Sequence, residues 1–284
     1  MSLQPLPTTQ FWKVEKPLEN VKFNTLFART VLENVLPGKI YADNIETPST
    51  FLIAHPYGMS LLFGETGNAE FNKSLRNYMI DAGRRKRTEW LQVSPGEWKP
   101  VLEELLGNDL VRKDATPEQP TSAPNDLAKV MEYTRVNFKF NESKYKAFAS
   151  QYEPPANEIV RTDARTFLEM QGQVIPRHFW RDTDHFLGEG VGFSLLEDGK
   201  AVSVAFCAFL YDNMLELGAE TSEQYRGKGY AIHVSKALID YCLESGFEPI
   251  WSCRLENTGS FKLALKLGFE PVLYLPYYQL PTKK

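Results

Sequence analysis

Hydrophobic residues in the C-terminal half of the chain form two neighbouring runs that are typical of strands. Residues 201–211 are almost continuously apolar, which predicts a buried strand that is too short to cross a membrane. Asp212 and Asn213 predict a turn, and residues 214–221 predict a second strand that pairs with the first as an antiparallel hairpin. We therefore expect two adjacent strands in the middle of this half.

Beyond the hairpin the apolar residues recur at helical spacing. Within residues 229–245 they lie three and four positions apart, and Gly246 ends the pattern. We then expect a strand at 249–254, a helix at 261–267 and a closing strand at 270–280. This mixture of strands and helices predicts the α/β class with a mixed sheet.

The N-terminal half shows a similar alternation. We expect strands at 39–44 and 50–63, the latter broken at 55–58, a helix at 70–82, a strand at 89–93, a helix at 97–106 and a strand at 109–113. Residues 114–126 are rich in proline and small polar residues, which is typical of a connector. The predicted organisation is an N-terminal α/β domain at 1–113, a linker at 114–130 and a C-terminal domain at 131–284.

The turn between the second strand and the long helix has the composition of an anion-binding site. A helix N-terminus offers unpaired backbone N–H groups and the positive end of the helix dipole. Gly227 and Gly229 keep the backbone accessible, while Arg226 and Lys228 attract a polyanion. The spacing fits neither a Walker A loop nor a dinucleotide fingerprint. The alternative is a strand-to-helix corner whose glycines have only a steric role.

Two motifs carry a resemblance to a known family. The segment Arg226-Gly227-Lys228-Gly229-Tyr230-Ala231 resembles the acetyl-CoA signature R/Q-x-x-G-x-G/A of the GCN5-related N-acetyltransferases, the GNAT superfamily. Asn257, followed by a helix that ends in Leu267-Gly268-Phe269, is similar to a second landmark of that family. Residues 158–284 carry this resemblance, and the chain is most similar to members with an additional N-terminal domain. It implies the GNAT fold with splayed central strands, and an N-terminal half that is either another α/β domain or a degenerate GNAT-like copy.

The resemblance implies acetyl-CoA as the co-substrate and assigns residues to it. The diphosphate would lie on the backbone N–H groups of residues 226–231. Splaying of the central strands would free ladder groups of Ala219, Glu220 and Thr221 to bind the pantetheine arm. Asn257 and Ser260 would contact the cofactor as well, and N-capping of the following helix is the alternative for Asn257.

Acetyl transfer to a primary amine needs a group that removes a proton from the ammonium. Glu216 and Glu220 lie four residues apart in the second predicted strand and would point to the same face. Gly218 is the expected place for a bulge, which would change that orientation. We expect Glu216 to be the base and Glu220 to be the reserve candidate. For each carboxylate the alternative is a solvated or salt-bridged strand residue.

One position departs from the family pattern. Many members carry a tyrosine that protonates the leaving thiolate where this chain has Ala264. Tyr274, Tyr277 and Tyr278 are candidates to replace it, or the thiolate leaves without a dedicated acid. The leading hypothesis is an N-acetyltransferase acting on a small-molecule or peptide amine, and the alternative is a noncatalytic acyl-CoA-binding regulatory module.

The amine acceptor would bind to residues 163–190, whose central part is dense in aromatic and ionisable side chains. The alternative is a helix-loop-helix in which Phe179 and Trp180 belong to the core. His178 and His185 lie seven residues apart, without a cysteine partner or a third ligand, so we expect no metal.

Composition narrows the class of protein. The chain has 284 residues, 43% of them hydrophobic, which allows two domains with substantial cores. A net charge of −4 argues against general nucleic-acid binding, and we expect the basic run at residues 84–87 to be a solvated helix end. Three cysteines imply no disulfide framework. With neither a leader nor a membrane span predicted, we expect a cytoplasmic protein without a membrane partner, and a homodimer stays open.

Overall fold

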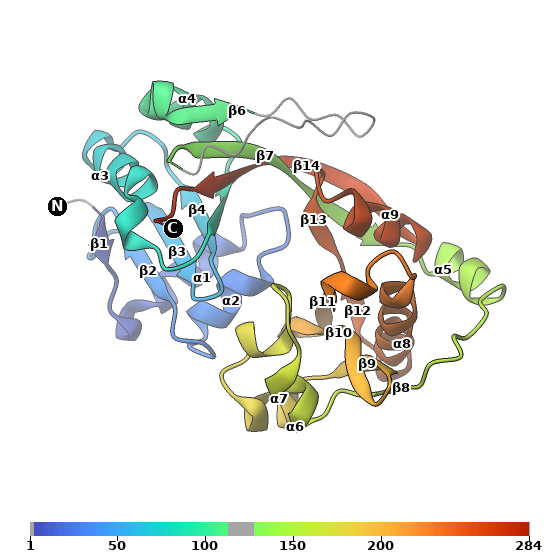
Figure 1. Ribbon diagram of the computed structural model, residues 1–284. Helices are drawn as coiled ribbons and strands as arrows, with labels where there is room; N and C mark the ends of the chain where they lie inside the picture. The colour runs from blue at the N-terminus through green and yellow to red at the C-terminus, as the bar shows by residue number, and fades with distance from the viewer. Residues whose placement is uncertain (1–2, 113–127, 284) are drawn as a thin grey trace. The chain divides into compact units, whose positions relative to one another are not determined.

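The computed structural model describes residues 3–112 and 128–283 (Figure 1). Most of the predicted linker at 114–130 lies outside these ranges. Contacts within the chain define two compact units. Unit 1 comprises Met1–Val136, Cys253–Thr258 and Leu273–Lys284, and unit 2 comprises Asn137–Ser252 and Gly259–Val272. The domain boundaries predicted from the sequence, at residues 113 and 131, stay predictions.

The larger sheet of the described chain has nine strands in the order β1-β2-β3-β4-β5-β14-β7-β13, with β6 paired to β7. Its strands are β1 (Gln4–Pro5), β2 (Lys39–Ala42), β3 (Thr50–His55), β4 (Met59–Gly64), β5 (Glu89–Ser94), β6 (Leu110–Arg112), β7 (Val130–Phe140), β13 (Ser252–Arg254) and β14 (Phe269–Leu280). The boundary between the units falls inside β7, β13 and β14. Segments from both ends of the chain therefore complete this one sheet.

The helices of unit 1 are α1 (Trp12–Leu18), α2 (Leu26–Leu32), α3 (Ala69–Ile80) and α4 (Trp98–Leu106), with short 3-10 turns η1 (Thr8–Gln10), η2 (Ala82–Arg84) and η3 (Gly107–Asp109). Two of these helices, α3 and α4, were predicted from the sequence, whereas α1 and α2 were not. Leu75 of α3 and Trp98 of α4 are fully buried in a core that also contains Leu91 and Tyr278 of the sheet. Alternate strand residues face these helices, because side chains in a strand alternate between its two faces.

Arg85 corrects the expectation that residues 84–87 form a solvated helix end. Its side chain is buried, and its Nε donates a hydrogen bond to Glu89 Oε2 at 2.8 Å. The other guanidinium nitrogens donate to backbone carbonyls, including those of Tyr78 at 2.6 Å and Asp81 at 2.8 Å. A buried charge is tolerated when it is paired and hydrogen-bonded. Arg85 therefore belongs to the interior of unit 1, while its three basic neighbours are exposed.

The sheet of unit 2 has five strands in the order β12-β11-β10-β9-β8. They are β8 (Ile159–Arg161), β9 (Gly192–Glu197), β10 (Lys200–Tyr211), β11 (Met214–Thr221) and β12 (Glu248–Ile250). The helices are α5 (Glu142–Ala149), α6 (Ala164–Glu169), α7 (Thr183–Glu189), α8 (Tyr230–Ser245) and α9 (Thr258–Lys266), with 3-10 turns η4 (Pro176–His178) and η5 (Glu223–Tyr225). α8 packs across β9 to β12 and buries Val234, Leu238 and Cys242, as its predicted apolar face requires.

Most predicted elements agree with the structure, but the strand predicted at 249–254 is wrong as a single element. It consists of two strands, β12 and β13, which are separated at Trp251 and belong to different sheets. β12 pairs with β11 in parallel, while β13 pairs with β7. The chain therefore leaves the five-stranded sheet at Trp251, and the predicted α/β class with mixed sheets and splayed central strands is confirmed.

The bulge expected at Gly218 lies on the neighbouring strand instead. β10 shifts its register between Cys207 and Phe209, while β11 continues regularly through Gly218. A Cβ atom at Gly218 would lie 2.6 Å from the ring of Phe206, so the glycine makes room for that ring. Because β11 is regular, Glu216 and Glu220 point to the same face of the sheet.

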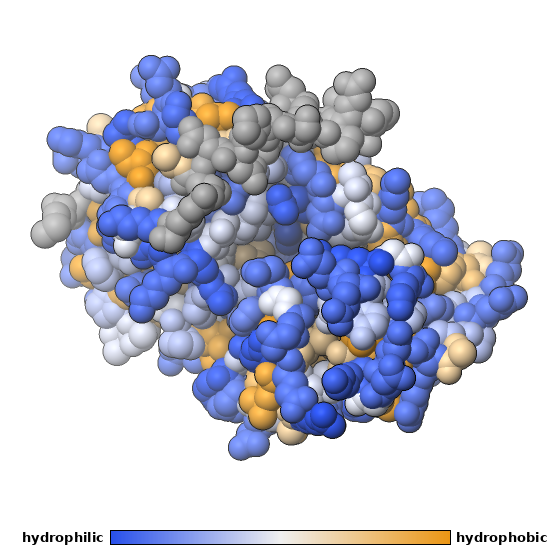
Figure 2. Space-filling view, in the orientation of Figure 1, coloured by the Kyte–Doolittle hydropathy of each residue, from blue (hydrophilic) through white to orange (hydrophobic). Residues whose placement is uncertain are grey.

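Hydrophilic residues cover most of the visible face, with hydrophobic residues scattered among them (Figure 2). Within residues 3–112 and 128–283, no helix has both the length and the apolar character that a membrane crossing requires. All three cysteines are free and buried, and burial raises the pKa of the Cys242 thiol to about 12.

Candidate functional site

The turn between β11 and α8 is open at its outer side. Gly227 and Gly229 have φ values of 82° and 83°, a left-handed conformation that residues with a Cβ adopt at a cost. A Cβ atom built on either glycine would meet no atom within 4 Å. No side chain of the described residues caps the N-terminus of α8 at Gly229. Backbone N–H groups at the start of the helix are therefore accessible to an anion, except that of Ile232, which donates to the carbonyl of Gly229 at 3.1 Å.

Glu197 at the end of β9 holds two side chains of this turn. Its carboxylate accepts hydrogen bonds from Tyr230 Oη at 2.6 Å and from Lys228 Nζ at 3.2 Å. Tyr230 first, and then Lys228, hold the pKa of the Glu197 carboxyl below its ordinary value. The Lys228 ammonium also lies 4.9 Å from the centre of the Tyr225 ring. Glu197 was missed by sequence reasoning, because it is far from the motif in the chain and carries no local signal.

Two nitrogens of the Arg226 guanidinium are hydrogen-bonded within the described chain, and the third is not. Its Nε donates to the carbonyl of Thr221 at 3.1 Å, and its Nη2 donates to Glu220 Oε1 at 3.1 Å. The side chain is 59% exposed, and its Nη1 has no partner within the described parts of the chain. A guanidinium held in this way can direct its remaining N–H groups at phosphate oxygens.

Strands β11 and β12 separate next to this turn. They pair in parallel from Met214 with Glu248 to Glu216 with Ile250, and no further pair between them occurs among the described residues. β10 continues to pair along the other edge of β11 up to Thr221. Ala219, Glu220 and Thr221 thus lie where the sequence placed them, on the split part of β11. Backbone groups on a split edge need partners, which a ligand amide can supply.

Glu216 lies at the point where the two strands begin to separate. The residue is 5% exposed, and its Oε1 accepts a hydrogen bond from Ser252 Oγ at 2.9 Å. Its partner in the last pair between β11 and β12 is Ile250. A buried, oriented carboxylate at the apex of the split has the properties expected of a general base.

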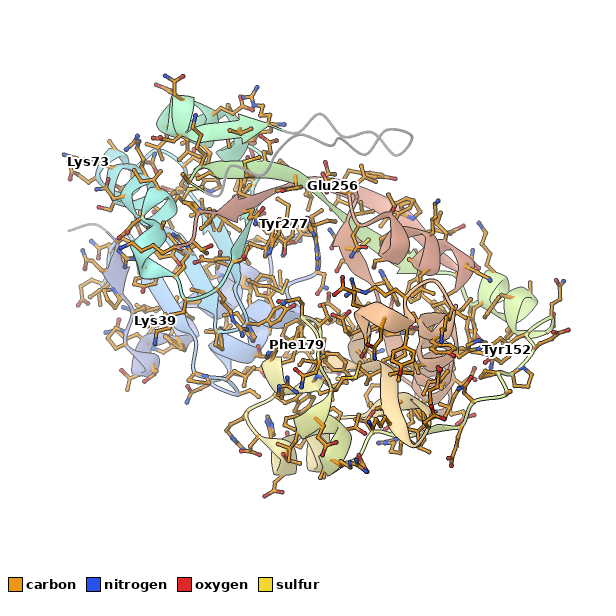
Figure 3. The ribbon with its side chains drawn as sticks, in the orientation of Figure 1. Lys39, Lys73, Tyr152, Phe179, Glu256 and Tyr277 are labelled. Carbon is orange, nitrogen blue, oxygen red and sulfur yellow. The ribbon has the colours of Figure 1, made fainter. Side chains whose placement is uncertain are left out.

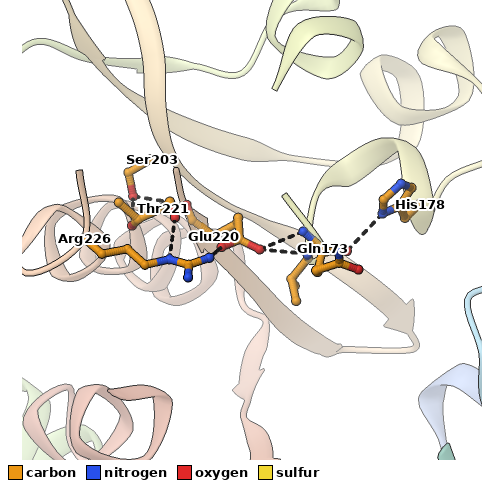
Figure 4. Close-up of polar contacts among 7 residues, drawn as sticks. Gln173, His178, Ser203, Glu220, Thr221 and Arg226 are labelled. Atoms are coloured by element: carbon orange, nitrogen blue, oxygen red, sulfur yellow. Dashed lines mark hydrogen bonds and ion pairs between the residues drawn. The ribbon is translucent and has the colours of Figure 1, made fainter. Parts of the chain in front are cut away.

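Glu220, the reserve candidate, is engaged with protein donors at both of its carboxylate oxygens (Figure 4). Oε1 pairs with Arg226, while Oε2 accepts the backbone N–H groups of Gln173 at 2.9 Å and Val174 at 3.1 Å. Its side chain is only 10% exposed. The structure thus joins Glu220 to the turn and to the predicted acceptor segment at the same time.

The acceptor segment predicted at 163–190 folds as α6, η4 and α7. Phe179, labelled in Figure 3, is buried. Its ring packs edge-on against those of Phe206 and Phe209, with ring centres 5.2 and 5.4 Å apart. The bulge in β10 turns both of these rings to one face of the sheet. Trp180 is partly buried, and its Nε1 donates to the carbonyl of Cys207 at 2.7 Å. The core role of Phe179 is therefore confirmed, and amine recognition by this segment stays a prediction.

His178 and His185 contact different groups. His178 Nδ1 bonds the carbonyl of Gln173 at 2.9 Å, whereas His185 Nε2 lies 3.4 Å from Glu189 on its own helix. The described residues contain no group of three or more His, Cys, Asp or Glu side chains arranged to hold a metal ion.

The remaining site residues are divided between the units. Asn257 lies in unit 1, exposed and immediately before α9, while Ser260 lies in unit 2 and accepts a hydrogen bond from Trp251 Nε1 at 3.2 Å. Ala264 is fully buried in α9. The candidate acids Tyr274, Tyr277 and Tyr278 belong to unit 1. The roles of these residues toward a cofactor or a leaving group stay predictions.

A split pair of parallel strands, an open glycine turn and a helix that begins at this turn define an acyltransferase of the GNAT type. The comparisons agree: the family model of GNAT acetyltransferases matches residues 16–278. The chain therefore belongs to the GNAT acetyltransferase family. This match extends well beyond the part that resembles the family by its motifs, and it includes most of unit 1.

Individual relatives cover nearly the whole chain. The uncharacterised N-acetyltransferase YdfB of Bacillus subtilis (strain 168) is 29% identical over 268 residues, which span 93% of this chain and 94% of the relative. A GCN5-related N-acetyltransferase-like protein from Streptococcus suis 89/1591 has a TM-score of 0.69 at 22% identity, over 96% of this chain and 98% of that one.

A tandem GNAT protein from the clavulanic acid biosynthesis pathway is also similar in fold. Its TM-score is 0.61 at 10% identity, over 99% of this chain and 98% of that one. At these identities both solved structures show the fold alone. Together with the family match, the comparisons support an acetyltransferase, and they offer no support for the noncatalytic alternative.

Proposed function

We propose that this acetyltransferase uses acetyl-CoA and transfers the acetyl group to a primary amine of a small molecule or a peptide. The observation that carries the proposal is the open turn at Gly227 and Gly229, where the N-terminus of α8 has no side-chain cap among the described residues. Arg226 and Lys228 add two cationic side chains to the same turn.

The residues present fit the diphosphate and pantetheine of CoA. Backbone N–H groups of residues 227–231 and the open Nη1 of Arg226 would bind the diphosphate, whereas the backbone N–H of Arg226 already donates to the carbonyl of Glu223 at 3.2 Å. The split edge of β11 at Ala219 and Thr221 would bond the amides of the pantetheine arm. When bound, the thioester supplies an activated acetyl group.

The chain itself supplies proton transfer and orientation. Glu216 would take a proton from the ammonium of the acceptor, so that the neutral amine can attack. Its carboxylate is oriented by the hydroxyl of Ser252 and shielded from water by burial. We further propose that unit 1 is noncatalytic, and that it derives from a GNAT-like copy that lost its phosphate turn.

Calorimetry with acetyl-CoA tests the cofactor. The parent protein should bind it, and Gly229→Glu should weaken binding by on the order of 100-fold, because the new side chain places negative charge and bulk at the diphosphate position. Gly246→Glu is the matched control. Gly246 ends the same helix with a φ of 79° and open surroundings, so this variant carries the same backbone strain away from the turn.

Retained binding in Gly246→Glu with loss in Gly229→Glu would support the proposal. Equal losses in both variants would attribute the effect to folding, and no binding to the parent protein would contradict acetyl-CoA dependence. A screen of primary amines for thiol release from acetyl-CoA would then identify the acceptor.

A further inference from the structure

One peptide unit in unit 2 is hydrogen-bonded at both of its ends. It joins the carbonyl of Gln173 to the N–H of Val174. Its N–H donates to Glu220 Oε2 at 3.1 Å, and its carbonyl oxygen lies 2.9 Å from Nδ1 of His178 (Figure 4). The preceding N–H, that of Gln173, donates to the same carboxylate oxygen at 2.9 Å. A carboxylate and an imidazole are thus connected through a single amide.

This arrangement determines which nitrogen of His178 carries the hydrogen. A carbonyl oxygen can only accept, so Nδ1 must be the donor, and in the neutral ring Nε2 is then the acceptor nitrogen. A charged acceptor at the N–H end polarises the amide and strengthens its carbonyl as an acceptor. The carboxylate of Glu220 therefore acts on the imidazole without touching it.

The aliphatic part of the Glu220 side chain also lies close to this segment. Gly172 precedes the peptide with a φ of 146°, and a Cβ atom built there would lie 2.4 Å from Glu220 Cγ. The segment can approach β11 this closely only because residue 172 has no side chain. Arg226 holds the second carboxylate oxygen from the opposite direction, so the orientation of Glu220 is fixed from both sides.

We propose that Glu220 is a positioning residue of this acetyltransferase: through the peptide of Gln173 and Val174 it holds the acceptor segment against β11 and keeps His178 protonated at Nδ1. The inference rests on the proposed function, and it assigns Glu220 a role other than that of reserve base. One carboxylate then serves two parts of the site, because it orients Arg226 for the cofactor and His178 for the amine.

The first test is nuclear magnetic resonance of protein labelled with ¹⁵N in its histidines, of which the chain has only four. In the parent, His178 should give the nitrogen shifts of a neutral ring protonated at Nδ1. Glu220→Gln removes the charge at constant size and should shift His178 toward the Nε2-protonated form that dominates in an unconstrained histidine side chain. Glu244→Gln, which removes an exposed carboxylate from α8, should leave the spectrum unchanged.

A second variant separates this effect from misfolding. Arg226→Met removes the cofactor-side partner but leaves the two backbone donors on Glu220, so His178 should keep its tautomer. Amide hydrogen exchange at Gln173 and Val174 should accelerate roughly tenfold in Glu220→Gln and stay near the parent rate in Arg226→Met. Unchanged exchange and unchanged His178 shifts in Glu220→Gln would overturn the proposal, as would equal changes in both variants.

Kinetics distinguish positioning from base catalysis once an acceptor amine has been found. Glu220→Gln should raise the KM for the amine by roughly tenfold while the pH profile of kcat keeps its shape. A collapse of kcat with an unchanged KM and loss of the low-pH limb of the pH profile would make Glu220 the base instead. Failure of the parent to bind acetyl-CoA would reject the proposed function, whereas the resonance and exchange tests of Glu220 need no ligand.

Discussion

Units 1 and 2 each contain a strand that leads through a turn into a helix, and the two helix N-termini differ. In unit 1, β4 leads into α3, and the side chain of Asn68 accepts the N–H of Phe71 at 3.1 Å. In unit 2, β11 leads into α8, whose N-cap is Gly229 and has no side-chain acceptor among the described residues. One N-terminus is closed by a side chain of its own turn, and the other, which lacks such a cap among the described residues, is the anion site of the proposed function.

The strands that lead into these turns also differ, in how far each pairs with its parallel neighbour. β4 pairs in parallel with β5 through five residue pairs, from Met59 with Trp90 to Phe63 with Ser94. β11 pairs with β12 through only three, and then the two strands separate. An uncapped helix and a split strand occur together in unit 2, and both leave backbone groups for a ligand. The difference supports a binding role for unit 2 and a structural one for unit 1.

The largest effect is expected at Glu216, the third residue of β11. The third residue of β4 in unit 1 is the buried Leu61, which has no ionisable side chain. Glu216→Gln should lower kcat by about 100-fold to 10,000-fold, because a positioned base contributes that much, while acetyl-CoA affinity stays unchanged. Steady-state kinetics and calorimetry measure the two quantities. Glu248→Gln, an exposed change on the neighbouring strand β12, is the control. An intact rate in Glu216→Gln would refute the base assignment.

A smaller effect is expected from removing the side chain that caps α3. Asn68→Ala removes the cap of α3 and should lower the free energy of unfolding by about 1 kcal/mol, as loss of an N-cap generally does. Urea denaturation followed by circular dichroism measures this change. Acetyl-CoA affinity should be unaffected, since the capped turn is not a binding site in the proposal. Weaker acetyl-CoA binding in a folded Asn68→Ala protein would contradict the distinction between the turns.

The smallest effect is expected from replacing single lysines, Lys228 in the turn before α8 and Lys73 in α3. Lys228→Met should weaken acetyl-CoA binding roughly threefold to tenfold at low salt, because an exposed ammonium contributes little and is screened. Lys73→Met on α3 is the matched change in unit 1, and it should leave binding as in the parent (Figure 3). Titrations at low and high salt compare the variants. A loss in Lys228→Met that does not shrink with salt would point to a structural role through Glu197.

Local patterns predicted the elements that carry the site. The hairpin, the long helix and its glycine stop were read correctly, because apolar periodicity and glycine positions are properties of the nearby sequence. The open turn also followed from its glycines, which have the positive φ values that the motif requires. The sequence motifs did not show that the family match extends beyond the C-terminal half, because unit 1 carries no motif of comparable strength.

Contacts between residues that are far apart in the sequence could not be predicted from local patterns. Glu197 reaches the turn from β9, and Glu220 is engaged by backbone donors of a segment nearly fifty residues earlier. The break at Trp251 depends on which sheet each half of the strand joins, and Arg85 is buried because Glu89 and Tyr78 surround it. These features follow from register and topology rather than from local composition.

The insertion of β13 and β14 into the larger sheet has a consequence for the order of folding. All strands of the five-stranded sheet come from one continuous stretch of chain, from β8 to β12. The nine-stranded sheet places β14 between β5 and β7, so it lacks an interior strand until β14 has been synthesised. Contacts between distant segments form slowly. During translation, the five-stranded sheet, which leads into the glycine turn, can therefore assemble before β14 is made, while the nine-stranded sheet, although begun earlier, must wait for that strand.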